Sequence, residues 1–126
     1  MKPFDSQGLP RDVLIVEDDA IIALDFEDTL LGFGVEKVRT AGNVVRALLL
    51  ISERAPDFAL LDVGLVGGKS FVVAERLHAM QIPFVFITGY SGEIGLPPAL
   101  KGTPMLPKPC TSDILLTALR RRARRG

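Results

Sequence analysis

The chain has 126 residues, of which 48% are hydrophobic and 24% charged, a balance typical of one globular domain rather than of a disordered chain. Its formal net charge is zero, so overall charge gives no reason to expect a nucleic-acid partner. No apolar run approaches the ~20 residues of a membrane span, and no signal-peptide core begins the chain. The single cysteine, Cys110, excludes an internal disulfide and fits a reducing compartment. A cytoplasmic protein is therefore expected.

Strand and helix patterns alternate in the first half of the chain. The nearly continuous apolar run Asp12–Glu17 predicts a strand that is covered on both faces. Apolar residues then recur at helical spacing from Ile22 to Phe33, and glycines at positions 32 and 34 predict the end of this helix. Residues 35–40 alternate like an outer strand, and a second helical stripe runs from Val44 to Ala55 before Pro56 stops it.

The second half continues this alternation. The fully apolar run Phe58–Asp62 predicts another buried strand, and apolar spacing from Phe71 to Leu77 predicts a third helix after a glycine-rich turn. Pro83–Thr88 has the pattern of a buried strand. Thr103–Pro107 is short and bounded by prolines, which is typical of an edge strand. Thr111 can then cap a last helix.

The segment Gly89–Pro104 interrupts the pattern where a helix would normally cover the sheet. It contains four glycines and three prolines in sixteen residues. Glycine and proline cost ~1 and ~3 kcal/mol at an interior helical site. We therefore predict a loop here, with at most one helical turn near Pro97–Leu100.

Strands that alternate with helices predict an α/β fold, a parallel sheet with helices on both faces. In such sheets ligands bind beyond the carboxyl ends of the strands. Polar residues follow four of the predicted strands at these ends: Glu17, Asp18, Asp19, Asp62, Thr88 and Lys108.

These residue types indicate phosphoryl chemistry. Clustered carboxylates repel one another and resist ionisation, and a divalent cation relieves that repulsion. Mg²⁺ prefers oxygen ligands and holds one or two carboxylates together with water and phosphate oxygens. Lys108 adds a positive charge and Thr88 a hydroxyl, the groups that position and neutralise a transferring phosphoryl group. A carboxylate can itself be the nucleophile, and Asp62, at the end of the central strand, fits that role best.

Four motifs carry a family resemblance: "VLIVEDD", "APDFALLDVGL", "FITG" and "PKP". In this order and at these separations, they resemble the receiver domain of two-component response regulators over essentially the whole chain. The resemblance implies a doubly wound, five-stranded parallel sheet of flavodoxin-like order 2-1-3-4-5. The glycines and prolines of Gly89–Pro104 predict that the fourth helix of this sheet is short or missing. It also implies a single receiver domain over residues 1–126, with its core at about 11–123, standing alone without an output domain.

The resemblance assigns metal-site roles to four residues. Asp62 becomes the phosphate acceptor and also a ligand of Mg²⁺. Asp18 coordinates the ion directly, and Glu17 supports it directly or through water. Gly64 stands where the family donates a backbone carbonyl to the metal.

Two more residues are implied to act on the phosphoryl group. The Thr88 hydroxyl meets that group and Lys108 pairs with it, and the Lys108–Pro109 peptide bond is expected to be cis. The domain would catalyse only its own phosphorylation and dephosphorylation, so it is not expected to be an enzyme acting on other substrates.

Departures from the family concern its usual switch. Receivers usually carry Tyr or Phe two or three residues before the conserved lysine, where this chain has Met105 and Leu106. With Tyr90 after the Thr-Gly pair, the chain resembles the FATGUY subgroup, although Ile87 replaces the usual Ala. That subgroup is associated with HWE-type sensor kinases. Tyr90 and Met105 are the switch candidates, and our hypothesis is that the Gly89–Pro104 loop orders when Thr88 is drawn to the phosphate.

Simpler interpretations compete at several positions. Asp19 is expected to cap the first helix rather than bind metal. The stretch "GLVGGKS" is similar to a phosphate-binding loop, but Val63 stands where the motif requires glycine, so Ser70 is expected only to help start a helix. His78 has no partner at metal-ligand spacing and is expected at the surface or at the boundary of the core. The five arginines between positions 120 and 125 are expected to form a solvated helix end, with a docking patch for an acidic partner as the weaker alternative.

The leading functional hypothesis is a phosphorylation-dependent signalling module. A sensor histidine kinase is the expected donor, an unknown protein is the downstream partner, and a phosphate sink remains an alternative to an activator. A pseudo-receiver that binds partners constitutively is the second hypothesis. A flavodoxin-like nucleotide or flavin binder is the third, although the chain has no Trp and one Tyr to sandwich a ring.

Overall fold

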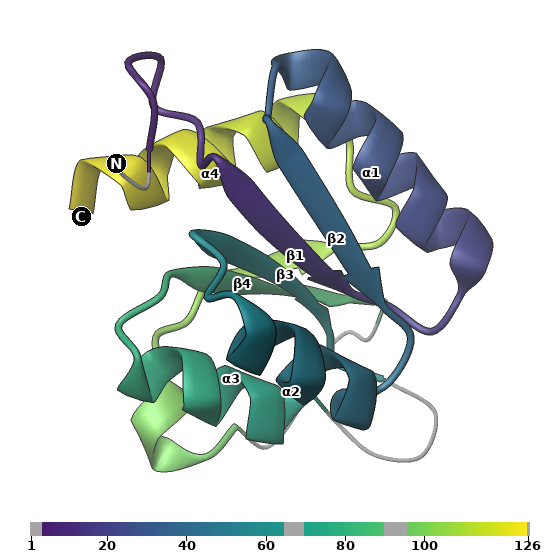
Figure 1. Cartoon of the computed structure of the whole chain (residues 1–126), viewed down its shortest axis with the longest axis vertical. Coiled ribbons are helices and arrows are strands. Elements are labelled where there is room, and N and C mark those ends of the chain that lie inside the picture. Colours follow the sequence, from purple (N-terminus) through teal and green to yellow (C-terminus); the bar gives the residue numbers. More distant parts are fainter. Residues whose placement is uncertain (1–3, 65–69, 90–95, 126) are drawn as a thin grey trace.

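The computed structural model describes residues 4–64, 70–89 and 96–125, and side chains as far as residue 121. Five strands form one all-parallel sheet in the order β2-β1-β3-β4-β5, which confirms the expected order (Figure 1). The strands are β1 (Asp12–Val16), β2 (Lys37–Ala41), β3 (Phe58–Asp62), β4 (Phe84–Thr88) and β5 (Met105–Pro107). The helices are α1 (Ala20–Phe33), α2 (Val44–Glu53), α3 (Phe71–Ala79) and α4 (Ser112–Arg125), and a 3₁₀ turn, η1, spans Pro98–Leu100.

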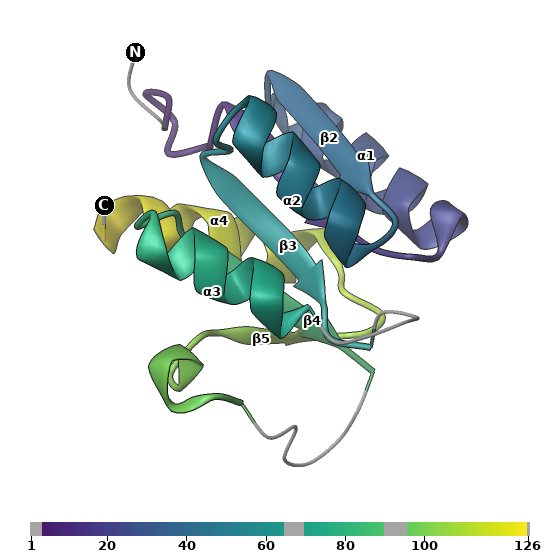
Figure 2. The ribbon, with the colours of Figure 1, turned by 60° about the horizontal axis from the view of Figure 1, so that its bottom comes forward.

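Helices cover both faces of the sheet. α1 and α4 lie on one face, and α2 and α3 lie on the other (Figures 1 and 2). Successive residues of a strand point to opposite faces, so Leu14 packs with α2 and α3 while Ile15 packs with α1 and α4. All five residues of β1, β3 and β4 are buried. This burial on both sides explains why the three strands have continuous apolar sequences rather than alternating ones.

The ends of α1 follow from local chemistry. The Asp19 carboxylate accepts hydrogen bonds from the backbone N–H groups of Ile21 and Ile22, at 2.9 and 3.1 Å, which confirms its role as the N-cap. Gly34 ends the helix in the left-handed conformation, with φ of 108°, which a residue without Cβ adopts at little cost. The Val35 N–H then donates to the Leu30 carbonyl, so Val35 completes the cap. The outer strand therefore begins at Lys37, and the predicted start at residue 35 was wrong.

Helix α2 is shorter than its sequence pattern predicted. It ends at Glu53, and Arg54 is extended with φ of −159°. Ala55 therefore lies beyond the helix and is exposed, so its inclusion in the apolar stripe was wrong. The buried positions of α2 are Ala47, Leu50 and Ile51.

An ion-pair network ties α2 to the amino-terminal edge of the sheet. Asp12 is 1% exposed, and its carboxylate lies 3.1 Å from Arg39 Nε and 3.2 Å from Arg54 Nε. The remaining guanidinium nitrogens of Arg39 donate to the carbonyls of Leu50 and Arg54, both at 2.9 Å. One arginine from β2 therefore pairs with a buried acid of β1 and donates to one carbonyl in the last turn of α2 and to another just after it.

The segment between β4 and β5 contains one described helical turn, η1, as predicted. Its Leu100 side chain is buried against the α2 and α3 side of the sheet. Ser70 stands at the first position before α3, but its buried hydroxyl has no hydrogen-bond partner in the described structure. It therefore starts α3 only through its backbone carbonyl, which accepts from the Ala74 N–H. No helix among the described residues is long and apolar enough to cross a membrane.

Candidate functional site

The parallel register brings the polar strand ends together at one edge of the sheet. Val16 pairs with Leu61, so Glu17 and Asp62 follow at adjacent strand ends. Thr88 ends β4 and pairs with Pro107, so Lys108 comes next on the neighbouring strand. Residues far apart in the sequence thus meet at the carboxyl edge, as sheets of this type require.

Three carboxylates form the acidic part of the site. One oxygen each from Glu17, Asp18 and Asp62 lies within 4.8 Å of the others. Glu17 and Asp62 are buried, whereas Asp18 is exposed. This set of hard oxygen donors, open to water on one side, fits Mg²⁺, which takes few carboxylates and keeps several waters.

Lys108 supplies the positive charge of the site. Its Nζ lies 3.0 Å from Glu17 Oε1 and 3.1 Å from Asp62 Oδ1. One ammonium group therefore bridges two buried carboxylates. The sequence predicted that Lys108 would lie at this edge but not its pairing with Glu17, because only the packed strands fix the distance between the residue that follows β1 and the residue that follows β5.

Burial and neighbouring charges shift the pKa values of both partners. The pKa of Glu17 is raised to about 7, because burial and the Asp62 charge outweigh the hydrogen bonds from the Asp19 N–H and Lys108 that lower it. For Lys108, burial acts to lower the pKa, but its hydrogen bonds to Glu17 and Asp62 outweigh that effect and raise it. Lys108 thus stays charged, while Glu17 exchanges its proton near neutral pH.

Backbone contacts hold the remaining predicted residues in place. Thr88 is buried, and its carbonyl accepts from the Lys108 N–H at 2.9 Å, which links the ends of β4 and β5. The Gly64 N–H donates to Asp62 Oδ1 at 3.3 Å. The Lys108–Pro109 peptide bond is cis, as expected.

Of the two switch candidates, the structure describes Met105 but not Tyr90. Met105 is half-buried on β5 and packs against the core on the α2 and α3 side. Tyr90 lies outside the described residues, as do residues 91–95 of the predicted switch loop.

Cys110 lies near the site. It lines a cavity of about 380 Å³ between α1 and the segment after β5, together with Lys108 and Phe26. Burial raises the pKa of its thiol, which disfavours the reactive thiolate. No feature of the sequence predicted a reactive cysteine here, and the burial of the thiol gives no reason to expect one either.

Comparisons with known proteins agree with this geometry. Residues 13–120 match the family model described as "Response regulator receiver domain". The chain is 32% identical over 107 residues to the phyllosphere-induced regulator PhyR of Methylorubrum extorquens, covering 79% of this chain and 40% of PhyR. It is 33% identical over 85 residues to the transcriptional regulatory protein PdtaR of Mycobacterium tuberculosis, covering 67% of this chain and 42% of PdtaR. The chain therefore spans less than half the length of either regulator.

A solved structure extends the comparison to nearly full length. The solution structure of SdrG from Sphingomonas melonis Fr1 superposes with a TM-score of 0.73 at 41% sequence identity. The superposition covers 89% of this chain and 97% of SdrG.

Proposed function

The chain belongs to the response regulator receiver domain family, and on this basis we propose that Asp62 accepts a phosphoryl group from the phosphohistidine of a sensor histidine kinase. The P–N bond of the donor breaks, a P–O bond forms to a carboxylate oxygen of Asp62, and the histidine nitrogen leaves with the electron pair. One observation carries this assignment: Asp62 ends the central strand with Lys108 Nζ 3.1 Å from its Oδ1.

The neighbouring groups have distinct roles in the proposed transfer. Lys108 offsets negative charge on the phosphoryl oxygens and on the attacking carboxylate, and the Thr88 hydroxyl donates to a phosphoryl oxygen. Glu17, Asp18, Asp62 and the Gly64 carbonyl would hold Mg²⁺. When bound, this ion would neutralise the charge of the transferring oxygens.

The phosphorylated domain then binds a protein partner differently, or passes its phosphate to water as a sink. The FATGUY-like sequence Phe86–Tyr90, which contains Thr88, supports a kinase of the HWE type as donor. Profiling phosphotransfer against the sensor kinases of the source organism tests this part: transfer confined to kinases of other types would contradict it.

Labelling by acetyl phosphate tests the chemistry without a kinase. The wild-type chain should acquire a Mg²⁺-dependent, hydroxylamine-sensitive phosphoryl group, and Asp62→Ala should acquire none. Asp113→Ala, which removes an exposed acid from α4, is the matched control and should label normally.

Two results would contradict the proposal. Retained Mg²⁺-dependent labelling in Asp62→Ala would place the acceptor elsewhere. A folded wild-type chain that neither labels nor binds Mg²⁺ would favour the constitutive binding module instead.

A further inference from the structure

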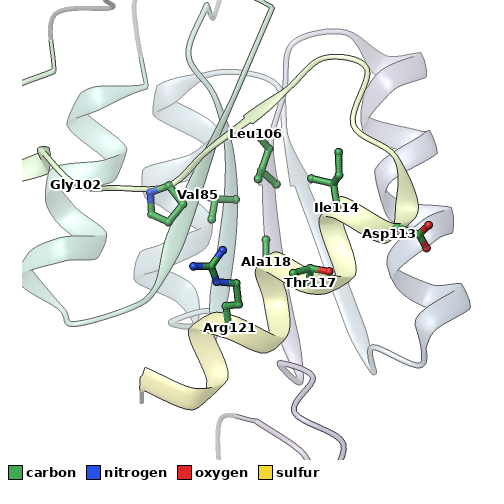
Figure 3. Close-up of a pocket in the computed structure, with 9 residues that line it drawn as sticks. Val85, Gly102, Leu106, Asp113, Ile114, Thr117, Ala118 and Arg121 are labelled. Carbon is green, nitrogen blue, oxygen red and sulfur yellow. The ribbon is translucent and has the colours of Figure 1, made fainter.

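A hollow of about 480 Å³ opens between helix α4 and the strands β4 and β5 (Figure 3). None of its lining residues belongs to the acidic cluster, and neither Thr88 nor Lys108 lines it. Sites for small molecules typically have volumes of ~300–1,000 Å³ and mostly apolar walls. The hollow is therefore large enough for a ligand and is separate from the site of the proposed phosphoryl transfer.

The floor of the hollow is apolar. Val85 and Leu106 come from the two strands and Ala118 comes from α4, and all three are buried by the protein around them. Ile114 stands above them on α4 and remains 39% exposed. An apolar body placed here would cover chiefly the exposed surface of Ile114, with smaller parts of Leu106 and Ala118, which is favourable by ~25 cal/mol for each Å² removed from water.

A cation faces this apolar floor. Arg121 lies two helical turns after Ile114, and its guanidinium points across the hollow toward Val85 (Figure 3). Asp113 also lines the hollow, but its carboxylate points away from it (Figure 3). Within the described part of the chain, Arg121 forms no ion pair. The hollow is thus complementary to a molecule with an apolar body and an anionic end.

The charge of the site favours a carboxylate over a phosphate. A guanidinium binds either group through two parallel hydrogen bonds. Arg121, however, is the one positively charged residue among the described residues that line the hollow. The opposite wall, at Gly102 and Pro104, adds no charge. A single guanidinium in this setting suits one negative charge better than two.

We propose that this hollow binds a small amphiphilic carboxylate, with its apolar body on Leu106, Ile114 and Ala118 and its carboxylate on Arg121. Octanoate is a suitable probe, and 1-octanol is the uncharged control with the same chain length. Titration of the isotopically labelled full chain, followed by the amide resonances of these residues, should show saturable shifts with octanoate and weaker binding of octanol.

Three variants test the assignment. Arg121→Gln should weaken octanoate binding by up to about fivefold, the range for an exposed ion pair, while leaving octanol unchanged. Ile114→Ala should weaken the binding of both probes, by about fourfold for each methylene group of the side chain that no longer packs against the probe. Arg120→Gln removes a neighbouring exposed arginine that does not line the hollow, and it should bind as the wild type does.

Several outcomes would overturn the proposal. Equal affinity for octanoate and octanol would remove the role of Arg121, as would equal losses in Arg120→Gln and Arg121→Gln. Shifts of the same resonances with protein concentration alone, together with a rise in molecular mass, would show that a second copy of the chain covers the hollow.

Discussion

Glu17 shows how one buried side chain can couple proton and metal binding. Glu17 is 4% exposed, and the pKa of its carboxyl is raised to about 7, chiefly by burial. An unperturbed glutamate has a pKa of ~4.3 and would be ionised throughout the neutral range. Glu17 instead carries a proton for part of the time, and a cation that binds beside it must displace that proton.

We therefore expect the Mg²⁺ affinity to rise with pH. Below the Glu17 pKa of about 7 the carboxyl is mostly protonated, and above it the carboxylate attracts the cation. Affinity should be about tenfold weaker at about pH 6 than at about pH 8, as measured by calorimetric titration. Glu17→Gln should bind Mg²⁺ more weakly and lose most of this dependence. A glutamine variant that keeps the full dependence would assign the titration to another group.

At the scale of single elements, caps and buried ion pairs fix where the helices begin and end. The caps at Asp19 and Gly34 were predictable, because each depends on one residue type at one position of a helix. The start of β2 and the end of α2 were not, since Val35 and Ala55 have apolar side chains whatever element they join. Where β2 starts depends on the cap that ends α1, and where α2 ends depends on its contacts with the sheet.

The Asp19 cap should stabilise the domain without holding metal. Asp19→Ala leaves the Ile21 and Ile22 N–H groups without this acceptor and should cost about 1 kcal/mol in urea denaturation. Asp19→Asn keeps a capping oxygen and should recover most of that loss. Mg²⁺ affinity should change little in the asparagine variant. A loss of affinity as large as that of Asp18→Ala would instead make Asp19 a metal ligand.

The arginines around Asp12 should differ in importance. Arg39→Ala leaves a buried carboxylate with only Arg54 and removes the donors to the end of α2, so it should cost about 3 kcal/mol of unfolding free energy. Arg54 is 59% exposed, and Arg54→Ala should cost about 1 kcal/mol or less. Urea denaturation of both variants measures the difference. Equal losses of unfolding free energy in the two variants would show that the burial of the arginine does not set the strength of its ion pair with Asp12.

The whole molecule places unlike charges from distant segments at one end of the sheet. Glu17, Asp62 and Lys108 come from three parts of the chain and meet because β1, β3, β4 and β5 are neighbours in parallel register. Three carboxylates cluster at this end of the sheet, and the Lys108 ammonium group pairs with two of them, Glu17 and Asp62. This excess of negative charge is the physical reason to expect divalent ions to stabilise the fold.

Mg²⁺ should therefore raise the thermal stability of the chain. An ion at ten times its dissociation constant should add about 1.4 kcal/mol of unfolding free energy. A chelator should reverse this gain, and Asp18→Ala should abolish most of it. Asp28→Ala, which removes an exposed acid of α1, is the matched control and should respond as the wild type does. An unchanged gain in Asp18→Ala would remove that residue from the proposed ligand set.

Local patterns along the chain were enough to predict the element order, the parallel sheet, the caps of α1 and the residues gathered at the carboxyl edge. These features depend on apolar periodicity and on residue types at strand ends, which need no knowledge of distant segments. The packed structure was needed to show that Lys108 bridges Glu17 and Asp62, that Arg39 joins Asp12 to α2, and that a hollow opens beside α4. Those features depend on distances between segments far apart in the sequence, which strand register and side-chain packing fix together.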